Sequence, residues 1–279
     1  MTRAATRVLH LSDTHLMAAG ALHNGLVDTT AALGHVLESL HGIGSVDAVV
    51  VSGDVSDDGT VASYTTARDL VGEFARSHGA VPVFAMGNHD TRGQFAEVLG
   101  PVRSVHDLDG FRVVVLDSSV PGRGYGFLDP EQLDWLRGEL ATPAARGSAV
   151  VLHHSPVRAP TVLHEALKLQ NPDDLLDALA GTDVRVVLSG HYHHHAAQTY
   201  PSGLTALVAP GVANRSDPFV AHGQERILRG HGALLVEVDE AGTVFSSVLS
   251  IPSPGDGEEL FVLDEETVQR IAAEAGVPR

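Results

Sequence analysis

Residue types that bind divalent metal ions follow five short apolar runs of this chain. The five motifs are Asp13-Thr14-His15, Gly53-Asp54, Gly87-Asn88-His89-Asp90, His153-His154-Ser155-Pro156 and Gly190-His191-Tyr192-His193. Carboxylate, amide and imidazole groups suit Zn, Mn and Fe alike, so the set does not select one metal. Thiolate ligands are excluded because the chain has no cysteine. The motifs therefore predict a metal centre built from oxygen and nitrogen ligands.

Each motif taken alone also has a plain structural explanation. Gly-Asp is common in turns, and Asn88 could form an Asx-turn that opens the next helix. The three consecutive histidines at residues 193–195 could bind metal adventitiously, and we expect His194 and His195 to be bystanders. All five motifs in one order, each after a predicted strand, are hard to explain without a metal centre.

The apolar runs predict the strands that position these motifs. They are residues 8–11, 48–51, 81–86, 149–152 and 184–188, and helical patterns lie between them at 27–40, 61–77, 130–140 and 172–179. Strands that alternate with helices predict an α/β fold with a mainly parallel sheet. The ends of such strands face a common crevice, where residues distant in sequence converge.

The later part of the chain has a different pattern. Strand-like segments with shorter connections recur at 111–116, 204–208, 232–238 and 243–251, and they predict a second, partly antiparallel sheet. Residues 251–257 are rich in Pro and Gly and indicate a break. A helix is predicted over 264–275, with Asp264 as its N-cap. We therefore expect a main domain of residues 1–251, and a linker and helix over 252–279 that pack on the body or on a partner subunit.

Composition excludes several classes of function. The 279 residues are 43% hydrophobic, which suffices for one large core. The net charge of −17 disfavours binding of nucleic acid through a basic patch. The longest apolar runs are far shorter than the ~20 residues of a membrane helix, so no membrane partner is expected. Residues 1–7 carry no apolar signal segment, and we expect a cytoplasmic protein.

The five motifs in this order resemble the calcineurin-like metallophosphoesterase superfamily, whose pattern is D-x-H, G-D, G-N-H-D/E, H and G-H-x-H. The surrounding sequence is similar to bacterial class III cyclic-nucleotide phosphodiesterases at residues 10–16, 115–122, 140–143 and 181–185. The resemblance implies a four-layer α/β/β/α sandwich of two mixed sheets with flanking helices. It also implies a phosphodiesterase that hydrolyses a 3′,5′-cyclic nucleotide, such as cAMP, to the 5′-nucleotide.

The resemblance further implies two divalent transition-metal ions, with Fe/Mn, Mn/Mn and Zn-containing pairs all open. The ligands it implies are Asp13, His15 and His193 for the first ion, Asn88, His153 and His191 for the second, and Asp54 as the bridge. Spacing alone does not decide between His153 and His154. The relatives with a His-His-x-Pro segment use the first histidine, which favours His153.

The resemblance also implies a mechanism. Two ions can lower the pKa of a shared water towards ~7, so that hydroxide attacks phosphorus. A ribose oxygen is a poor leaving group and needs a proton, and His89 is the candidate donor. We expect Asp90 to hold His89 or to cap the next helix.

In the cyclic-nucleotide relatives a histidine-rich loop follows Val-Pro-Gly. Here that loop contains Arg123 and Tyr125, either of which could contact a phosphate or a base.

Other substrates of the same superfamily stay open, namely glycerophosphodiesters, 2′,3′-cyclic nucleotides and phosphomonoesters. A non-catalytic metal-binding scaffold is a remote alternative, since a scaffold has no use for an acid such as His89. The expected partners are a small phosphodiester substrate and, from the resemblance only, a second copy of the chain in a homodimer. The residues that bind the substrate are not determined by the sequence, although His23 and Asn24 are candidates for the pocket.

Overall fold

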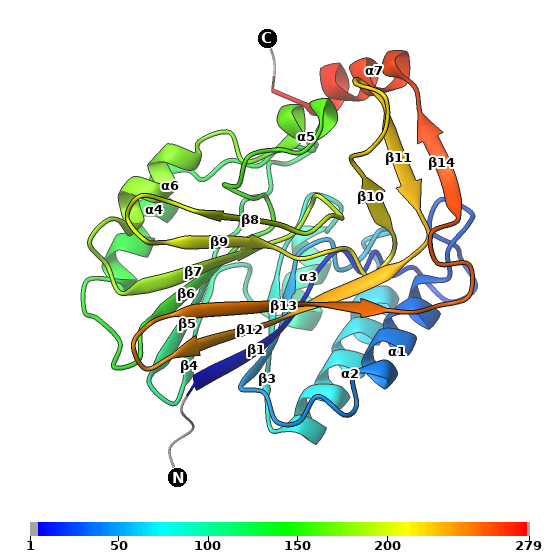
Figure 1. Ribbon diagram of the computed structural model, residues 1–279. Helices are drawn as coiled ribbons and strands as arrows, with labels where there is room; N and C mark the ends of the chain where they lie inside the picture. Colours follow the sequence, from blue (N-terminus) through cyan, green and yellow to red (C-terminus); the bar gives the residue numbers. More distant parts are fainter. Residues whose placement is uncertain (1–4, 278–279) are drawn as a thin grey trace.

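The computed structural model describes residues 5–277. Residues 1–4 and 278–279 lie outside the described residues. They are the outer ends of the predicted main domain, 1–251, and of the predicted linker and helix, 252–279. Residues 1–4 are also most of the segment 1–7 in which no signal segment was expected. Two large β-sheets pack face to face, and helices cover the outer face of each sheet (Figure 1). The expected four-layer α/β/β/α sandwich is therefore confirmed.

The first sheet has the strand order β13-β12-β1-β2-β3. Its parallel part consists of β1 (Ala5–Leu11), β2 (Ala48–Ser52) and β3 (Val81–Ala85). Its antiparallel part consists of β12 (His231–Asp239) and β13 (Val244–Ile251). The helices that follow the parallel strands are α1 (Thr29–Ser39), α2 (Val61–His78) and α3 (Arg92–Leu99). Their apolar side chains pack on the outer face of this sheet.

The second sheet has the strand order β4-β5-β6-β7-β9-β8. Its parallel strands are β5 (Phe111–Val115), β6 (Ser148–Val151), β7 (Val184–Ser189) and β9 (Thr205–Val208). The edge strands β4 (Ser104–Leu108) and β8 (Ala196–Thr199) pair antiparallel to their neighbours. The helices that cover the outer face are α4 (Pro130–Glu139) and α6 (Pro172–Leu179).

The central core lies between the two sheets. Val50 and Val236 of the first sheet and Val113, Val151 and Leu188 of the second are all fully or almost fully buried in it. Strands β2 and β6 are nearly continuous apolar runs, as expected for parallel strands covered by layers on either side. This packing fixes the two sheets relative to one another, and with them the loops that follow their strands.

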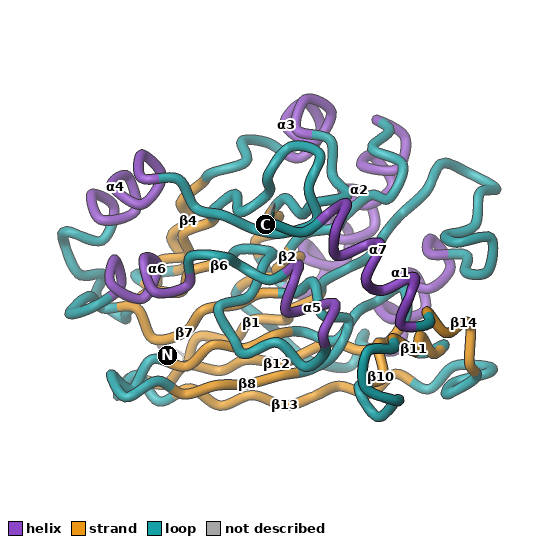
Figure 2. The backbone as a smooth tube through the Cα atoms, turned by 90° about the horizontal axis from the view of Figure 1, so that it is seen from above, coloured by secondary structure: helices purple, strands orange, loops and turns teal. Residues whose placement is uncertain are grey.

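A small third sheet lies at one end of the molecule. It consists of β10 (Arg215–Asp217), β11 (Glu225–Leu228) and β14 (Glu259–Leu263), all antiparallel. Figure 2 shows these strands grouped near α7 (Glu265–Ala275) and α5 (Val162–Leu167). The predicted C-terminal helix is confirmed, and the Asp264 carboxylate accepts a hydrogen bond from the Thr267 amide at 2.9 Å, as expected of its N-cap. Helix α7 packs against α5.

Two predictions about the sheets are wrong. The alternation of strands and helices predicted one mainly parallel sheet for residues 8–188, but β6 and β7 belong to the second sheet. We expected residues 232–238 and 243–251 to belong to the second sheet, but β12 and β13 complete the first sheet beside β1. The reason is that β12 pairs with a strand more than 200 residues earlier, and no local pattern encodes such a pairing.

The described helices include none that is long and apolar enough to cross a membrane.

Candidate metal centre

The five motifs lie in the loops after β1, β2, β3, β6 and β7, where the ends of the two sheets meet. Backbone hydrogen bonds connect these loops directly. The Asp13 amide donates to the Gly53 carbonyl at 3.1 Å, and the His15 amide donates to the Asp54 carbonyl at 2.9 Å. The Gly190 amide donates to the His153 carbonyl at 3.0 Å. The fold therefore brings residues from both sheets into one crevice, as the parallel-strand pattern predicted.

The backbone at this site is unusual. Seven non-glycine residues among the described ones have a positive φ, and the five that carry predicted ligands are Asp13, His15, Asp54, His191 and His193, with φ between 44° and 73°. A left-handed conformation costs about 1–2 kcal/mol at a non-glycine residue. Strained backbone of this kind is concentrated at functional sites, where the surrounding structure enforces it. Tertiary packing therefore orients these side chains at the expense of local stability.

The first group of side chains comprises Asp13, His15 and His193. Nε2 of His193 lies 3.1 Å from Nε2 of His15 and 3.4 Å from Oδ1 of Asp13. The possible ligand atoms of these three residues lie within 4.8 Å of one another. That spacing allows all three to reach one ion.

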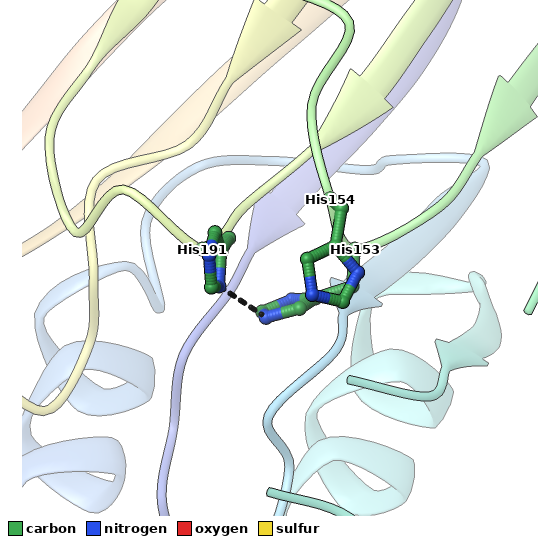
Figure 3. A group of neighbouring side chains, drawn as sticks. All are labelled: His153, His154 and His191. Atoms are coloured by element: carbon green, nitrogen blue, oxygen red, sulfur yellow. Dashed lines mark hydrogen bonds between the residues drawn. The ribbon is translucent and has the colours of Figure 1, made fainter. Parts of the chain in front are cut away.

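The second group is built around His153. Its Nε2 lies 3.2 Å from Nδ1 of His191, the contact drawn in Figure 3, and 3.3 Å from Oδ2 of Asp54. The same Asp54 oxygen lies 3.6 Å from Nε2 of His15 in the first group. The Asp54 carboxylate therefore lies between the two groups, and one of its oxygens is close to a histidine of each.

The two consecutive histidines after β6 have different surroundings. His154 lies within the same 4.8 Å as His153 and His191, but both of its ring nitrogens already have partners. Nδ1 of His154 lies 2.9 Å from the Ser118 hydroxyl, and Nε2 donates to the Gly124 carbonyl at 3.1 Å. His153 uses only Nδ1 for a backbone carbonyl, that of Ser52, and its Nε2 faces Asp54. The geometry favours His153 as the ligand, because its Nε2 faces the side chains of this centre and not a backbone carbonyl.

Nine buried side-chain polar atoms have no hydrogen-bond partner among the described residues, and three of them belong to predicted ligands. These three are Oδ1 of Asn88, Nε2 of His191 and Nδ1 of His193. The amide of His89, next to Asn88, donates to Oδ1 of Asp54 at 2.9 Å, which keeps this loop against the centre. Buried polar groups without a partner are rare, and an ion is one explanation for them. The donor set and its unpaired atoms therefore fit divalent metal ions.

The charges at the centre suit metal binding. Burial lowers the pKa of His15 and of His193 to about 4, so both imidazoles are neutral at pH 7. Neutral imidazole is the form that binds a metal. Burial acts to raise the pKa of Asp54, but the positive charges of His153 and His89 outweigh it and hold that pKa well below its usual value. The central carboxylate is therefore ionised.

Sequence reasoning missed Asp57, which lies in the loop after β2. Its Oδ1 lies 2.9 Å from Nδ1 of His89 and 3.0 Å from Nδ1 of His15, and its Oδ2 lies 3.3 Å from Nδ1 of His23. One carboxylate thus orients three histidines that line the crevice. Asp57 follows Asp54 by three residues, but nothing in that spacing indicates that its partners are histidines from two other loops.

The expectation for Asp90 is wrong. Its carboxylate accepts hydrogen bonds from the amides of Val55, Ser56 and Gly87 at 2.8–3.1 Å, so it fastens the loop after β3 to the loop after β2. Asp57, and not Asp90, holds His89. The N-cap residue of α3 is Thr91. Buried backbone amides need acceptors, and the nearest carboxylate supplies them here.

The Arg123 loop contacts the C-terminal helix. The Arg123 guanidinium donates to the Glu274 carbonyl at 2.9 Å, and the Gly124 amide donates to the Ala275 carbonyl at 2.8 Å. Arg123 therefore bonds the end of α7, whereas we expected it to be available for a phosphate or a base. Carbonyl groups at a helix C-terminus favour such a cationic partner.

Two sheets with a crevice of carboxylate, amide and imidazole groups at the ends of their strands define a metal-dependent phosphoesterase. Residues 6–195 match the family model described as calcineurin-like phosphoesterase. The chain belongs to this family, and membership implies divalent metal ions and a small phosphodiester substrate.

Two curated proteins are similar over most of their length. One is a probable cyclic nucleotide phosphodiesterase of Rhodococcus erythropolis, 38% identical over 90% of this chain and 88% of that protein. The other is a cAMP/cGMP dual specificity phosphodiesterase of Mycobacterium tuberculosis, 39% identical over 97% of this chain and 86% of that protein. Among solved structures, a dimetal phosphatase from Danio rerio superposes with a TM-score of 0.58 at 15% identity, covering 88% of this chain and 99% of that one. This last likeness concerns the fold alone.

Proposed function

We propose that this chain hydrolyses 3′,5′-cyclic nucleotides, such as cAMP, to 5′-nucleotides with the help of two divalent transition-metal ions. The observation that carries the proposal is the position of Asp54 between two histidine groups, 3.6 Å from His15 and 3.3 Å from His153. A carboxylate in that position suits a bridge between two ions. The names of the two curated relatives, both cyclic nucleotide phosphodiesterases, support the choice of substrate.

The ligand assignment follows the two groups. One ion would be held by Asp13, His15 and His193, the other by Asn88, His153 and His191, and Asp54 would contribute to both. The free amide oxygen of Asn88 and the free Nε2 of His191 support the second site. The ion pair would be Fe/Mn, Mn/Mn or Zn-containing, because carboxylate, amide and imidazole ligands suit all three.

When bound, the two ions would supply an activated water and offset the charge that develops on the phosphate. His89 supplies the proton that the departing 3′ oxygen needs. Burial lowers the pKa of His89, but the charge of Asp54 and the hydrogen bond to Asp57 outweigh it and raise the pKa to about 9, which keeps the imidazole protonated at pH 7. Asp57 binds Nδ1, so Nε2–H is left to face the crevice. The His89 side chain is 45% exposed, so a substrate can reach it.

Steady-state rates on a panel of substrates test this function. The panel comprises cAMP, cGMP, 2′,3′-cAMP, glycerophosphocholine and a phosphomonoester, each with Mn²⁺ supplied. We expect the highest kcat/KM for a 3′,5′-cyclic nucleotide, and loss of activity after chelation. A higher kcat/KM for any other member of the panel would replace the substrate proposed here, and activity that survives complete metal removal would contradict the metal assignment.

The remaining expectations stay predictions. These are the homodimer, the lack of nucleic-acid and membrane partners, the cytoplasmic location, and the division of the chain at residue 251. The packing of α7 against α5 supports placing the C-terminal helix on the body of the same chain. The net charge of −17 argues against nucleic acid as a substrate.

A further inference from the structure

The small sheet turns one face towards the metal centre. Its register pairs Ser216 with Ile227, Ile227 with Phe261, and Glu225 with Leu263. Side chains alternate between the two faces of a strand, and directly paired residues share a face. All five side chains therefore lie on the same face of the sheet.

These five residues line a cavity of about 290 Å³. The same cavity is lined by His15, His89 and His193 of the candidate metal centre. Its volume is close to the lower limit of small-ligand sites, roughly 300–1,000 Å³. A substrate whose phosphate lies at the metal centre would therefore extend towards the face of the small sheet.

We propose that this face binds the nucleoside part of the substrate. Ile227, Phe261 and Leu263 pack against the base, and Glu225 accepts hydrogen bonds from N–H groups on the edge of the base. The inference rests on the cyclic nucleotide phosphodiesterase function proposed above and names the residues that select its substrate. The three strands lie beyond residue 195, where the match to the family model ends, so they are candidates for a feature that differs within the family.

Glu225 is the polar group that gives this face selectivity. The residue is only 1% exposed, and its two carboxylate oxygens accept hydrogen bonds from the hydroxyls of Thr161 and Ser216. An ionised carboxylate has about four acceptor positions, so each oxygen keeps one for a ligand. Guanine offers two adjacent N–H donors on its Watson–Crick edge, whereas adenine offers only its amino group. Two parallel hydrogen bonds fit a carboxylate best, so Glu225 favours guanine.

The opposite face of the sheet supplies a matched control. Val262 neighbours Phe261 in β14, pairs with Arg226 and is 40% exposed. Arg226 donates to the Asp217 carboxylate at 3.0 Å on that same face. Val262→Ala thus removes an apolar side chain from the same strand without touching the cavity. Comparison of Phe261→Ala with Val262→Ala therefore separates weaker binding of the nucleoside from lower stability of the sheet.

The first experiment measures kcat/KM for cAMP, for cGMP and for 4-nitrophenyl methyl phosphate, a small diester without ribose or base. Phe261→Ala should lower kcat/KM for both cyclic nucleotides by roughly 10–200-fold, mainly through KM, as expected for apolar pocket contacts. The small diester should be hydrolysed as by wild type, and Val262→Ala should match wild type on all three. Equal losses for Phe261→Ala and Val262→Ala, or an equal loss on the small diester, would overturn the subsite.

The second experiment tests Glu225→Gln at pH 8, where ionisation of this buried carboxyl is favoured. The variant should lower the ratio of kcat/KM for cGMP over cAMP by roughly 10-fold or more, because the amide keeps only one acceptor oxygen and cannot accept both hydrogen bonds from guanine. An equal loss on both nucleotides would mean that Glu225 only holds Thr161 and Ser216, and would overturn its role in selection.

Failure of the proposed function gives a different result. In that case wild type hydrolyses the small diester but neither cyclic nucleotide. Calorimetric binding of cGMP then decides the subsite, since a nucleoside site weakens in Phe261→Ala whether or not turnover occurs. Equal affinity of wild type and Phe261→Ala for cGMP would overturn the inference.

Discussion

Nδ1 of His89 lies 2.9 Å from Oδ1 of Asp57, and this contact fixes which ring nitrogen of His89 faces the crevice. A carboxylate that orients an imidazole also stabilises its protonated form. The same carboxylate orients His15, a proposed metal ligand. Asp57 therefore connects the proposed proton donor to the proposed metal centre.

The first prediction concerns Asp57→Asn. The Asp57 hydrogen bond and charge are among the causes that raise the pKa of His89, so the substitution should lower that pKa. A general acid must be protonated, so the decline of kcat at high pH should shift to lower pH. We expect a loss of roughly 10–100-fold at pH 8, typical of a group that orients a metal ligand. The pH profile of kcat on cAMP tests this, with metal content measured in parallel. If the decline of kcat at high pH does not shift in the variant, Asp57 does not raise the pKa of the proton donor.

The second prediction concerns His89→Ala. On a cyclic nucleotide the loss in kcat should be roughly 10²–10⁴-fold, the usual contribution of proton transfer. On an activated aryl diester, whose phenolate leaves without a proton, the loss should be much smaller. Metal content should stay near that of wild type. Equal losses on both substrates with metal retained would show that His89 binds the phosphate and does not donate a proton.

The ligand residues could be predicted because each follows a local signal. Asp13 and His191 each follow the end of an apolar run within three residues, and parallel strands carry such residues to one edge. The partner of Asp57 could not be predicted in this way. Its contact with His89 joins two loops, and it depends on backbone conformations that the packed sheets impose. Asp90 was misread for the opposite reason. Its position just before α3 indicated a helix cap, but its carboxylate accepts hydrogen bonds from buried backbone amides, two of which belong to the loop after β2.

The fold shows the same limit. Strands β2 and β7 were predicted from β-branched runs, which are local features. The pairing of β12 with β1 joins Ala5 to Asp239, and the small sheet joins β11 to β14 across about thirty residues. Strand order is decided by which apolar faces remain to be covered, and this information is distributed over the whole chain.

The third prediction concerns Asp54→Ala. If Asp54 bridges two ions, its loss should reduce metal content from about two ions per chain and abolish phosphodiesterase activity. Elemental analysis of the purified variant and of wild type, both supplied with the same metal, measures the metal content per chain. Full metal content in the variant would contradict the bridge, even if activity were lost.

The fourth prediction compares His153→Ala with His154→Ala. Nε2 of His153 faces the centre, 3.3 Å from Oδ2 of Asp54, so removal of this side chain should empty the second site. Both nitrogens of His154 are occupied by Ser118 and Gly124, so its removal should weaken metal binding or activity by only roughly 10–100-fold, as for a residue that supports a ligand. Metal titrations of the two variants test the difference. The reverse order of severity would exchange the two assignments.

The fifth prediction concerns the stability of the fold at low pH. Burial lowers the pKa of His10, which lies 2.8 Å from the Ser52 hydroxyl, to about 3, with His195 a smaller cause. The unfolded chain binds this proton near pH 6.5, so between pH 6.5 and 3 the unfolded state holds more protons than the native state. The free energy of unfolding therefore falls as pH falls, by up to about 1.4 kcal/mol per pH unit from His10. His10→Gln has no such group and should show a shallower slope. Urea unfolding of both proteins in chelator from pH 7 to pH 4 tests this. Parallel slopes for the two proteins would mean that His10 does not contribute.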